Sequence, residues 1–180
     1  MDKASNNNLI KSLPSKTYIY EYKILKKIGQ GGFGTTYLCL DTNLNRQCVL
    51  KEYTPYKLVT RKDNGILSPI FKEKYESGLK HFLYEAQYLA KFNHPNIVRV
   101  NRYFRANGTA YFVMDYENGK SLRNILNERK SLFEENEIFS IIEPLCNGLT
   151  QLHHQQLIHR DIKPDNIIVR PNCDPILIDL

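Results

Sequence analysis

The sequence predicts an α+β fold in which an antiparallel sheet with one helix is followed by a mainly helical part. Residues 18–51 contain short runs of β-branched and aromatic residues separated by turn formers, which indicates three antiparallel strands. Residues 75–92 and 138–152 instead repeat apolar side chains at steps of three and four, the period of an amphipathic helix. With 180 residues, the chain is long enough for one large domain or two small lobes.

Two further strands complete the predicted sheet. Residues 94–100 and 110–116 flank the turn signal Asn107-Gly108, so we expect them to bring the sheet to five strands. The polar stretch 54–71 contains two prolines and predicts a long irregular loop. In the helix at residues 75–92, Glu85 falls at the margin of the apolar stripe and is expected to turn partly inward.

Cap signals locate two helices in the second part of the chain. Ser121 is a plausible cap for a short helix that ends near Arg129. Residues 131–134 match a capping box in front of the longer helix. Pro144 should bend that helix or leave one backbone carbonyl unpaired.

These elements divide the chain into three parts. Residues 1–17 are expected to be a short disordered lead, residues 18–117 to form the sheet-containing lobe, and residues 118–180 to begin with a hinge. In the last part, residues 167–169 and 176–178 predict a short hairpin.

Composition excludes several classes of protein. No apolar run approaches the roughly 20 residues of a membrane helix, and the first residues lack the apolar core of a secretory signal, so we expect a cytoplasmic protein without a membrane segment. The four cysteines form no close pair, which argues against a zinc site or a disulfide framework. The net charge of +6 comes entirely from residues 1–90, where scattered lysines without an aromatic platform favour an ordinary solvated surface over nucleic-acid binding.

The segment Gly29-Gln30-Gly31-Gly32-Phe33-Gly34 matches G-x-G-x-x-G, which by itself is a weak signal. Because residues 35–40 continue as a strand, the glycines do not open a helix as they would in a dinucleotide-binding fold. A glycine hairpin between two strands can still place backbone N–H groups over phosphates. A merely flexible turn is an equally good interpretation of this segment alone.

Other polar residues are ambiguous when each is considered singly. Lys51 ends an apolar strand and would need a partner if buried, and Glu85 is a candidate, although a surface lysine and a solvated glutamate are the commoner case. Asp161, Asn166 and Asp179 could each be turn formers or caps. The histidines at positions 153, 154 and 159 lack acidic or cysteine partners at zinc-like spacing and are expected to be structural.

The order of these features carries more information than any one of them. A glycine loop, a strand lysine, a helix glutamate, the segment His159-Arg160-Asp161-Ile162-Lys163-Pro164-Asp165-Asn166 and Asp179 after an apolar strand occur in sequence. From about Tyr22 to its end the chain therefore resembles the protein kinase family, whose fold has two lobes. With Lys163 two residues after Asp161, the segment resembles that of the serine/threonine subgroup. Residues 51–53, the long insertion before the helix and residues 107–111 are together similar to bacterial serine/threonine kinases of the eukaryotic-like type.

The resemblance implies a site for ATP. The backbone of Gly29, Gly31 and Gly34 would cover the phosphates, Lys51 would bind the α- and β-phosphates, and Glu85 would hold Lys51 by an ion pair. The residues that would enclose the adenine are Ile28, Thr36, Val49, Met114 and Ile168, with hydrogen bonds from the backbone of Asp115 to Glu117.

The resemblance also implies roles in transfer to a serine or threonine hydroxyl of a protein substrate. Asp161 would orient that hydroxyl and accept its proton, while Lys163 would neutralise charge on the transferring phosphoryl group. Asn166 and Asp179 would ligate Mg²⁺ through hard oxygen atoms.

The chain departs from the family's pattern at a few positions. Thr36 and Val49 stand where valine and alanine are usual, and Leu180 stands where phenylalanine is usual. Leu180 is the last residue of the sequence, so we expect the activation loop and most of the helical lobe that the resemblance implies to be missing. We expect a truncated kinase domain with a complete five-stranded N-lobe and an incomplete helical C-lobe. The alternative is an inactive nucleotide-binding or regulatory fragment that acts by association with another protein.

Overall fold

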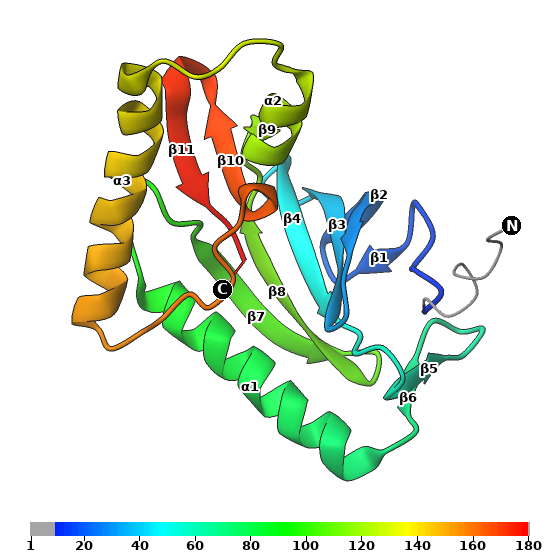
Figure 1. Ribbon diagram of the computed structural model, residues 1–180. Coiled ribbons are helices and arrows are strands. Elements are labelled where there is room, and N and C mark those ends of the chain that lie inside the picture. The colour runs from blue at the N-terminus through cyan, green and yellow to red at the C-terminus, as the bar shows by residue number, and fades with distance from the viewer. Residues whose placement is uncertain (1–9, 180) are drawn as a thin grey trace, which may run out of the picture. The chain divides into compact units, whose positions relative to one another are not determined.

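The computed structural model describes residues 10–179 (Figure 1). The chain forms two compact units. The first contains the described residues up to Ala90 together with Val100–Tyr116, and the second contains Lys91–Arg99 and the described residues from Glu117 onward. Each unit is described below by itself. Within residues 10–179, no helix combines the length and apolar character needed to cross a membrane.

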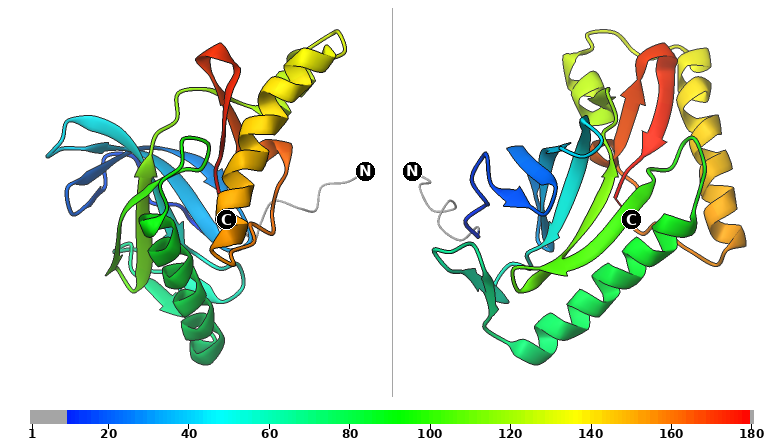
Figure 2. Two further views of the ribbon diagram at one scale, coloured as in Figure 1. Left: turned by 90° about the vertical axis from the view of Figure 1, so that its left-hand side faces the viewer. Right: turned by 180° about the vertical axis from the view of Figure 1, so that it is seen from behind.

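The first unit is built on one antiparallel sheet with strand order β1-β2-β3-β4-β8-β7. Its strands are β1 (Tyr18–Ile19), β2 (Tyr22–Gln30), β3 (Gly34–Asp41), β4 (Arg46–Tyr53), β7 (Val100–Ala106) and β8 (Thr109–Asp115). The five longer strands agree with the predicted five-stranded sheet, to which the two-residue β1 adds an edge. Helix α1 (Lys72–Lys91) packs along this sheet, as further views show (Figure 2).

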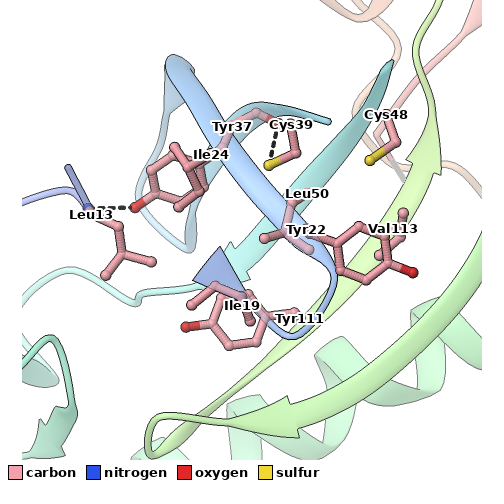
Figure 3. Packing of buried hydrophobic residues seen from close by; sticks show 10 residues of the cluster. All are labelled: Leu13, Ile19, Tyr22, Ile24, Tyr37, Cys39, Cys48, Leu50, Tyr111 and Val113. Atoms are coloured by element: carbon pink, nitrogen blue, oxygen red, sulfur yellow. Dashed lines mark hydrogen bonds between the residues drawn. The ribbon is translucent and has the colours of Figure 1, made fainter. Parts of the chain in front are cut away.

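One face of this sheet carries a closed hydrophobic core (Figure 3). Tyr37, Leu50 and Tyr111 are fully buried there, and Cys39 lies directly opposite Cys48 on adjacent strands. Burial raises the pKa of Cys39 to about 12 and that of Cys48 to about 11, so both thiols are protonated at neutral pH. They behave as small apolar side chains in the core.

The strand expected at residues 94–100 was placed too early. β7 begins at Val100, and residues 94–99 belong to the second unit. There the Asn96 side-chain amide donates to the Pro175 carbonyl at 2.7 Å, and the Val98 N–H donates to the Leu177 carbonyl at 2.9 Å. These bonds hold the segment beside another strand, so its apolar residues are buried without joining the larger sheet.

The expectation of an irregular loop at residues 54–71 was wrong. β5 (Val59–Arg61) and β6 (Leu67–Pro69) form a two-stranded hairpin whose Val59 and Leu67 are buried. The turn between them contains Asn64-Gly65, a strong hairpin signal that the sequence already carried. Two prolines and a polar composition concealed the short strands on either side.

Residues 10–17 were expected to belong to a disordered lead but pack against the first sheet. Leu13 is buried, and its N–H donates to the hydroxyl of Tyr37 at 3.0 Å (Figure 3). The Lys16 N–H donates to the Ile24 carbonyl at 2.8 Å. The rest of the predicted lead, residues 1–9, lies outside the described residues, as does Leu180.

The second unit contains a three-stranded sheet with order β11-β10-β9. Its elements are β9 (Lys120–Ser121), α2 (Leu122–Glu128), α3 (Glu135–His154), β10 (Ile167–Arg170) and β11 (Asp174–Leu177), with short 3-10 turns at Pro164–Asn166 and Pro171–Cys173. The β10–β11 hairpin agrees with the predicted one, and the Ser121 side chain accepts from the Asn124 N–H as a cap should.

The start of α3 differs from the capping box predicted at residues 131–134. The helix begins after Glu134, whose backbone N–H donates to the carboxylate of Glu137 at 2.8 Å. Arg129 also binds Glu137 through two hydrogen bonds of 2.9 and 2.7 Å. This ion pair fixes the first turn of the helix three residues later than the sequence pattern suggested.

Candidate functional site

Lys51 and Glu85 meet in the first unit. Lys51 lies on β4, opposite Phe112 of β8, and its Nζ is 3.7 Å from Oε1 of Glu85 on α1. The Lys51 side chain is 14% exposed and that of Glu85 is 25% exposed. The ammonium group also lies 5.2 Å from the centre of the Phe112 ring, within cation–π range. The structure therefore brings together the lysine and glutamate that were ambiguous as single residues.

The glycine segment forms the connection between β2 and β3, as the strand interpretation required. The Gly31 N–H donates to the Gly34 carbonyl at 2.9 Å. A Cβ at Gly34 would lie 2.8 Å from the Glu52 carbonyl oxygen, so only glycine fits at this close crossing of β3 and β4. A Cβ at Gly31 or Gly32 would meet no atom within 4 Å. The tip of the loop is thus open, while its base is packed.

Three of the residues expected near adenine lie on the face of the sheet that carries Lys51. Thr36 pairs with Lys51 across β3 and β4, and Val49 pairs with Met114 across β4 and β8. Because paired residues share a face and residues two apart on a strand do too, these four side chains lie on one side of the sheet. Gly29 pairs with Thr36 at the β2 end of that row.

The other residues expected near the nucleotide lie at a bulge, at a strand end or in the second unit. Ile28 sits at a bulge of β2 and is 45% exposed. Asp115 ends β8, where its carboxylate accepts from Asn101 at 2.7 Å. In the second unit, Glu117 accepts from Arg170 at 3.3 Å, and Ile168 pairs with Ser121 across β10 and β9.

Asp161, Lys163 and Asn166 form one hydrogen-bonded cluster in the second unit. Lys163 Nζ donates to Asp161 Oδ2 at 2.6 Å. The Asn166 amide nitrogen donates to the same Oδ2 and to the Asp161 backbone carbonyl, both at 2.9 Å. The 3-10 turn Pro164–Asn166 makes this possible, because it folds the chain back within five residues.

Asp179 lies next to this cluster along the chain fold. The N–H of Ile178 donates to the Asn166 backbone carbonyl at 2.8 Å, which brings the backbone next to Asp179 close to the segment of Asp161 and Asn166. Asp179 has φ of 67°, in the left-handed region that aspartate tolerates better than most residues.

The donor set suits a magnesium ion. Because the Asn166 nitrogen is directed at Asp161, its side-chain oxygen is the atom of the amide that a cation would meet. Asp179 contributes a carboxylate, and Mg²⁺ prefers such oxygen ligands, usually with water completing its shell. Within residues 10–179 no group of three or more His, Cys, Asp or Glu side chains is arranged to hold a metal ion.

The pKa of Asp161 is expected to lie below its ordinary value. The hydrogen bond from Lys163 lowers it most, Asn166 adds to this, and Asp161 in turn raises the pKa of Lys163. The carboxylate and its pairing are therefore present above the ordinary aspartate pKa and are lost as pH falls through the lowered value. A carboxyl-carbon NMR titration should show this depression, and Lys163→Met should raise the pKa. An Asp161 pKa at or above the usual value in the wild-type chain would contradict the geometry.

Sequence reasoning missed a buried polar network on the core side of β4. The Glu52 side chain is fully buried and accepts two hydrogen bonds from Arg61, at 3.1 and 2.6 Å. It also accepts from the hydroxyls of Tyr37 at 3.0 Å and Tyr111 at 2.8 Å. An acidic residue at an inward position of an apolar strand, one residue after Lys51, was the signal that could have revealed it.

This network connects the β5–β6 hairpin to the strand of Lys51. Arg61 also donates to the Gly65 carbonyl at 2.8 Å and to the Lys11 carbonyl at 2.7 Å. Burial disfavours the guanidinium charge, but hydrogen bonds and charge from Glu52 outweigh it, so the pKa of Arg61 is raised. Just before the hairpin, the N–H groups of Thr54 and Tyr56 donate to the Phe33 and Gly32 carbonyls of the glycine loop.

Comparison with known proteins agrees with this arrangement. Residues 22–180 match the family described as Protein kinase domain. Serine/threonine-protein kinase Nek1 of Mus musculus is 35% identical over 150 residues, which cover 83% of this chain and 11% of that protein. Serine/threonine-protein kinase C of Synechocystis sp. is 32% identical over 171 residues, which cover 92% of this chain and 30% of that protein.

A solved structure is similar over nearly the same region. The apo form of PpkA-294 shares 34% sequence identity and superposes with a TM-score of 0.87, covering 93% of this chain and 61% of that chain. The chain spans less than a third of the length of these two curated relatives. The order of motifs, the sheet with its lysine–glutamate pair and the matched family agree, and the chain belongs to the protein kinase family, where it groups with serine/threonine kinases.

Proposed function

We propose that this chain carries out ATP- and Mg²⁺-dependent transfer of the γ-phosphoryl group to serine or threonine hydroxyls of a protein substrate. The observation that supports this most directly is the Asp161–Lys163–Asn166 cluster, in which a carboxylate is held ionised beside an ammonium group. The proposal places the chain in the cytoplasm, where ATP is abundant. Nucleic acid has no part in it.

The first unit would bind the nucleotide. Lys51 lies on a strand and is partly shielded from water, so water weakens its attraction for phosphate oxygens only a little. Glu85 fixes the position of the ammonium group by the ion pair. The open tip of the glycine loop leaves backbone N–H groups accessible to phosphates, because no side chain stands in the way at Gly31.

The second unit would supply the groups for transfer. Asp161 would accept the proton of the attacking hydroxyl, and its lowered pKa means that it is ionised and ready to do so at neutral pH. Lys163 would neutralise negative charge on the phosphoryl oxygens. Mg²⁺ bound to Asn166 and Asp179 would supply charge neutralisation on the nucleotide phosphates.

Nucleotide binding is the first test. The purified chain is expected to bind ATP in the presence of Mg²⁺ in titration calorimetry, and Lys51→Met should weaken binding roughly 10- to 100-fold, the effect of removing a charge-assisted contact worth about 1.5–3 kcal/mol. Lys72→Met, at the exposed start of α1, provides a matched control that should bind like the wild type. Equal binding by the wild type and Lys51→Met would contradict the proposed role of Lys51.

Transfer of labelled phosphate to a generic basic protein substrate is the second test. Mg²⁺-dependent labelling of serine or threonine is expected, and chelation of the metal should abolish it. ATP binding without any transfer would contradict the proposed activity and would instead favour a nucleotide-binding regulatory role. Labelling of tyrosine alone would contradict the assigned substrate class.

A further inference from the structure

At Gly78, α1 lies very close to Tyr53 of the sheet. A Cβ placed there would lie 2.0 Å from the hydroxyl oxygen of Tyr53 and 3.1 Å from the carbon that carries it. Gly78 has no positive φ, so its backbone conformation does not require glycine. Glycine is also a poor helix former, and alanine would favour the helix at this position. The presence of glycine at position 78 is therefore explained by the space that the Tyr53 side chain needs.

Tyr53 is held firmly in this position. Its side chain is 3% exposed, and its backbone carbonyl accepts from the Thr109 hydroxyl at 2.6 Å. Its ring lies 5.3 Å from the ring of Tyr75 and 5.3 Å from that of Phe82, both on α1. Because Tyr53 is fixed by neighbours on α1 and by Thr109 of β8, it limits how closely α1 can pack on β4.

The same two elements carry the lysine and the glutamate of the candidate site. Lys51 and Tyr53 are two residues apart on β4 and share a face, while Gly78 and Glu85 are seven residues apart on α1, which is about two turns. Between the two contacts, Phe82 of α1 packs on Phe112 at 4.8 Å.

The Phe112 ring also contacts the Lys51 ammonium group. The rings of Tyr53, Phe82 and Phe112 therefore form a continuous series of contacts from Gly78 to the ion pair. The Lys51–Glu85 pair has little tolerance for movement of the helix. Lys51 Nζ and Glu85 Oε1 are 3.7 Å apart, which is close to the upper limit of about 4 Å for an ion pair. A shift of α1 by a few tenths of an ångström would lengthen this contact further.

We propose that Tyr53 and Gly78 are positioning residues that set the depth at which α1 packs on β4, and thereby the reach between Lys51 and Glu85. Neither residue would touch the nucleotide. Their effect on binding would pass through the ion pair, so this inference rests on the proposed nucleotide-binding role of Lys51. It assigns a function to a glycine that helix propensity alone would disfavour.

The variant Gly78→Ala tests the inference. It should raise the Kd for ATP with Mg²⁺ about fivefold, which corresponds to about 1 kcal/mol of lost ion-pair stabilisation. Ser77→Ala, at the adjacent exposed position of α1, makes the same kind of propensity change and should leave the Kd unchanged. Removing the hydroxyl in Tyr53→Phe/Gly78→Ala should recover most of the lost affinity, because the 2.0 Å contact is gone and only the 3.1 Å contact with the ring carbon remains.

A double-mutant cycle separates positioning from general damage. If Gly78→Ala acts through the ion pair, it should have no further effect in a Glu85→Gln background. Additive losses would overturn the inference, and so would unchanged binding by a folded Gly78→Ala chain. If Gly78→Ala does not fold, the double variant Tyr53→Phe/Gly78→Ala is expected to fold and to bind ATP. A double variant that does not fold or does not bind ATP would overturn the inference as well.

A readout that needs no nucleotide distinguishes this inference from the proposed function. In ¹⁵N NMR spectra, the Lys51 Nζ resonance should move in the same direction in Gly78→Ala as in Glu85→Gln, because both weaken the same ion pair. If the wild-type chain binds no ATP, the proposed function fails while this comparison still decides the positioning role. A Lys51 resonance that moves in Glu85→Gln but not in a folded Gly78→Ala chain would overturn that role.

Discussion

Replacing Arg61 by methionine should destabilise the first unit by about 3–5 kcal/mol, because it leaves the carboxylate of Glu52 buried without its cationic partner. The Glu52 side chain is fully buried, and the two tyrosine hydroxyls that remain can donate hydrogen bonds but carry no charge. Chemical denaturation followed by circular dichroism measures the loss. Burial and the Glu52 charge also raise the pKa of Tyr37 and Tyr111, so neither tyrosine ionises near neutral pH.

Arg46 provides the matched control for this prediction. It lies on the same strand as Glu52, and its ion pair with Asp115 is 3.4 Å long with half of the arginine side chain exposed. Arg46→Met should change the free energy of unfolding by no more than about 1 kcal/mol. Adding Glu52→Gln to Arg61→Met removes the buried charge and should recover part of the stability. A loss below 1 kcal/mol in Arg61→Met would show that the hairpin is not anchored by this pair.

The second large effect is expected for Asp161→Asn, which should lower phosphoryl transfer by about 10²- to 10⁴-fold while leaving ATP affinity close to that of the wild type. The substitution keeps the size of the side chain but removes the negative charge that accepts the proton. Lys163 also loses its carboxylate partner at 2.6 Å. Single-turnover transfer measured beside calorimetric binding separates the loss of chemistry from the loss of affinity.

Asp165→Asn is the matched control for this loss. Asp165 belongs to the same segment, and its exposed carboxylate lies 3.4 Å from Arg123, so the same chemical change is made a few residues away. We expect transfer by this variant to stay within a factor of about two of the wild type. Equal losses in the two variants would mean that the segment, rather than the Asp161 carboxylate, is what matters.

The local sequence pattern predicted most of the secondary structure, because helices and strands depend mainly on residues that are close in sequence. The alternation along β3 and β4 and the three–four period of α1 were sufficient to place these elements. The same reasoning failed at residues 94–99, where bonds to a distant strand decided the outcome. It failed again at the β5–β6 hairpin, whose short strands are stabilised by Arg61 rather than by their own propensity.

The sequence by itself determined the order of the motifs and the chemistry of each residue type, and with them the family. A lysine on an apolar strand and a carboxylate in the segment with Asn166 are recognisable without coordinates. Only the tertiary structure decided which of these groups meet, that Glu52 needs Arg61, and that Gly78 makes room for Tyr53. The physical reason is that these contacts join residues far apart in the chain, and their distances follow from packing, which local pattern does not encode.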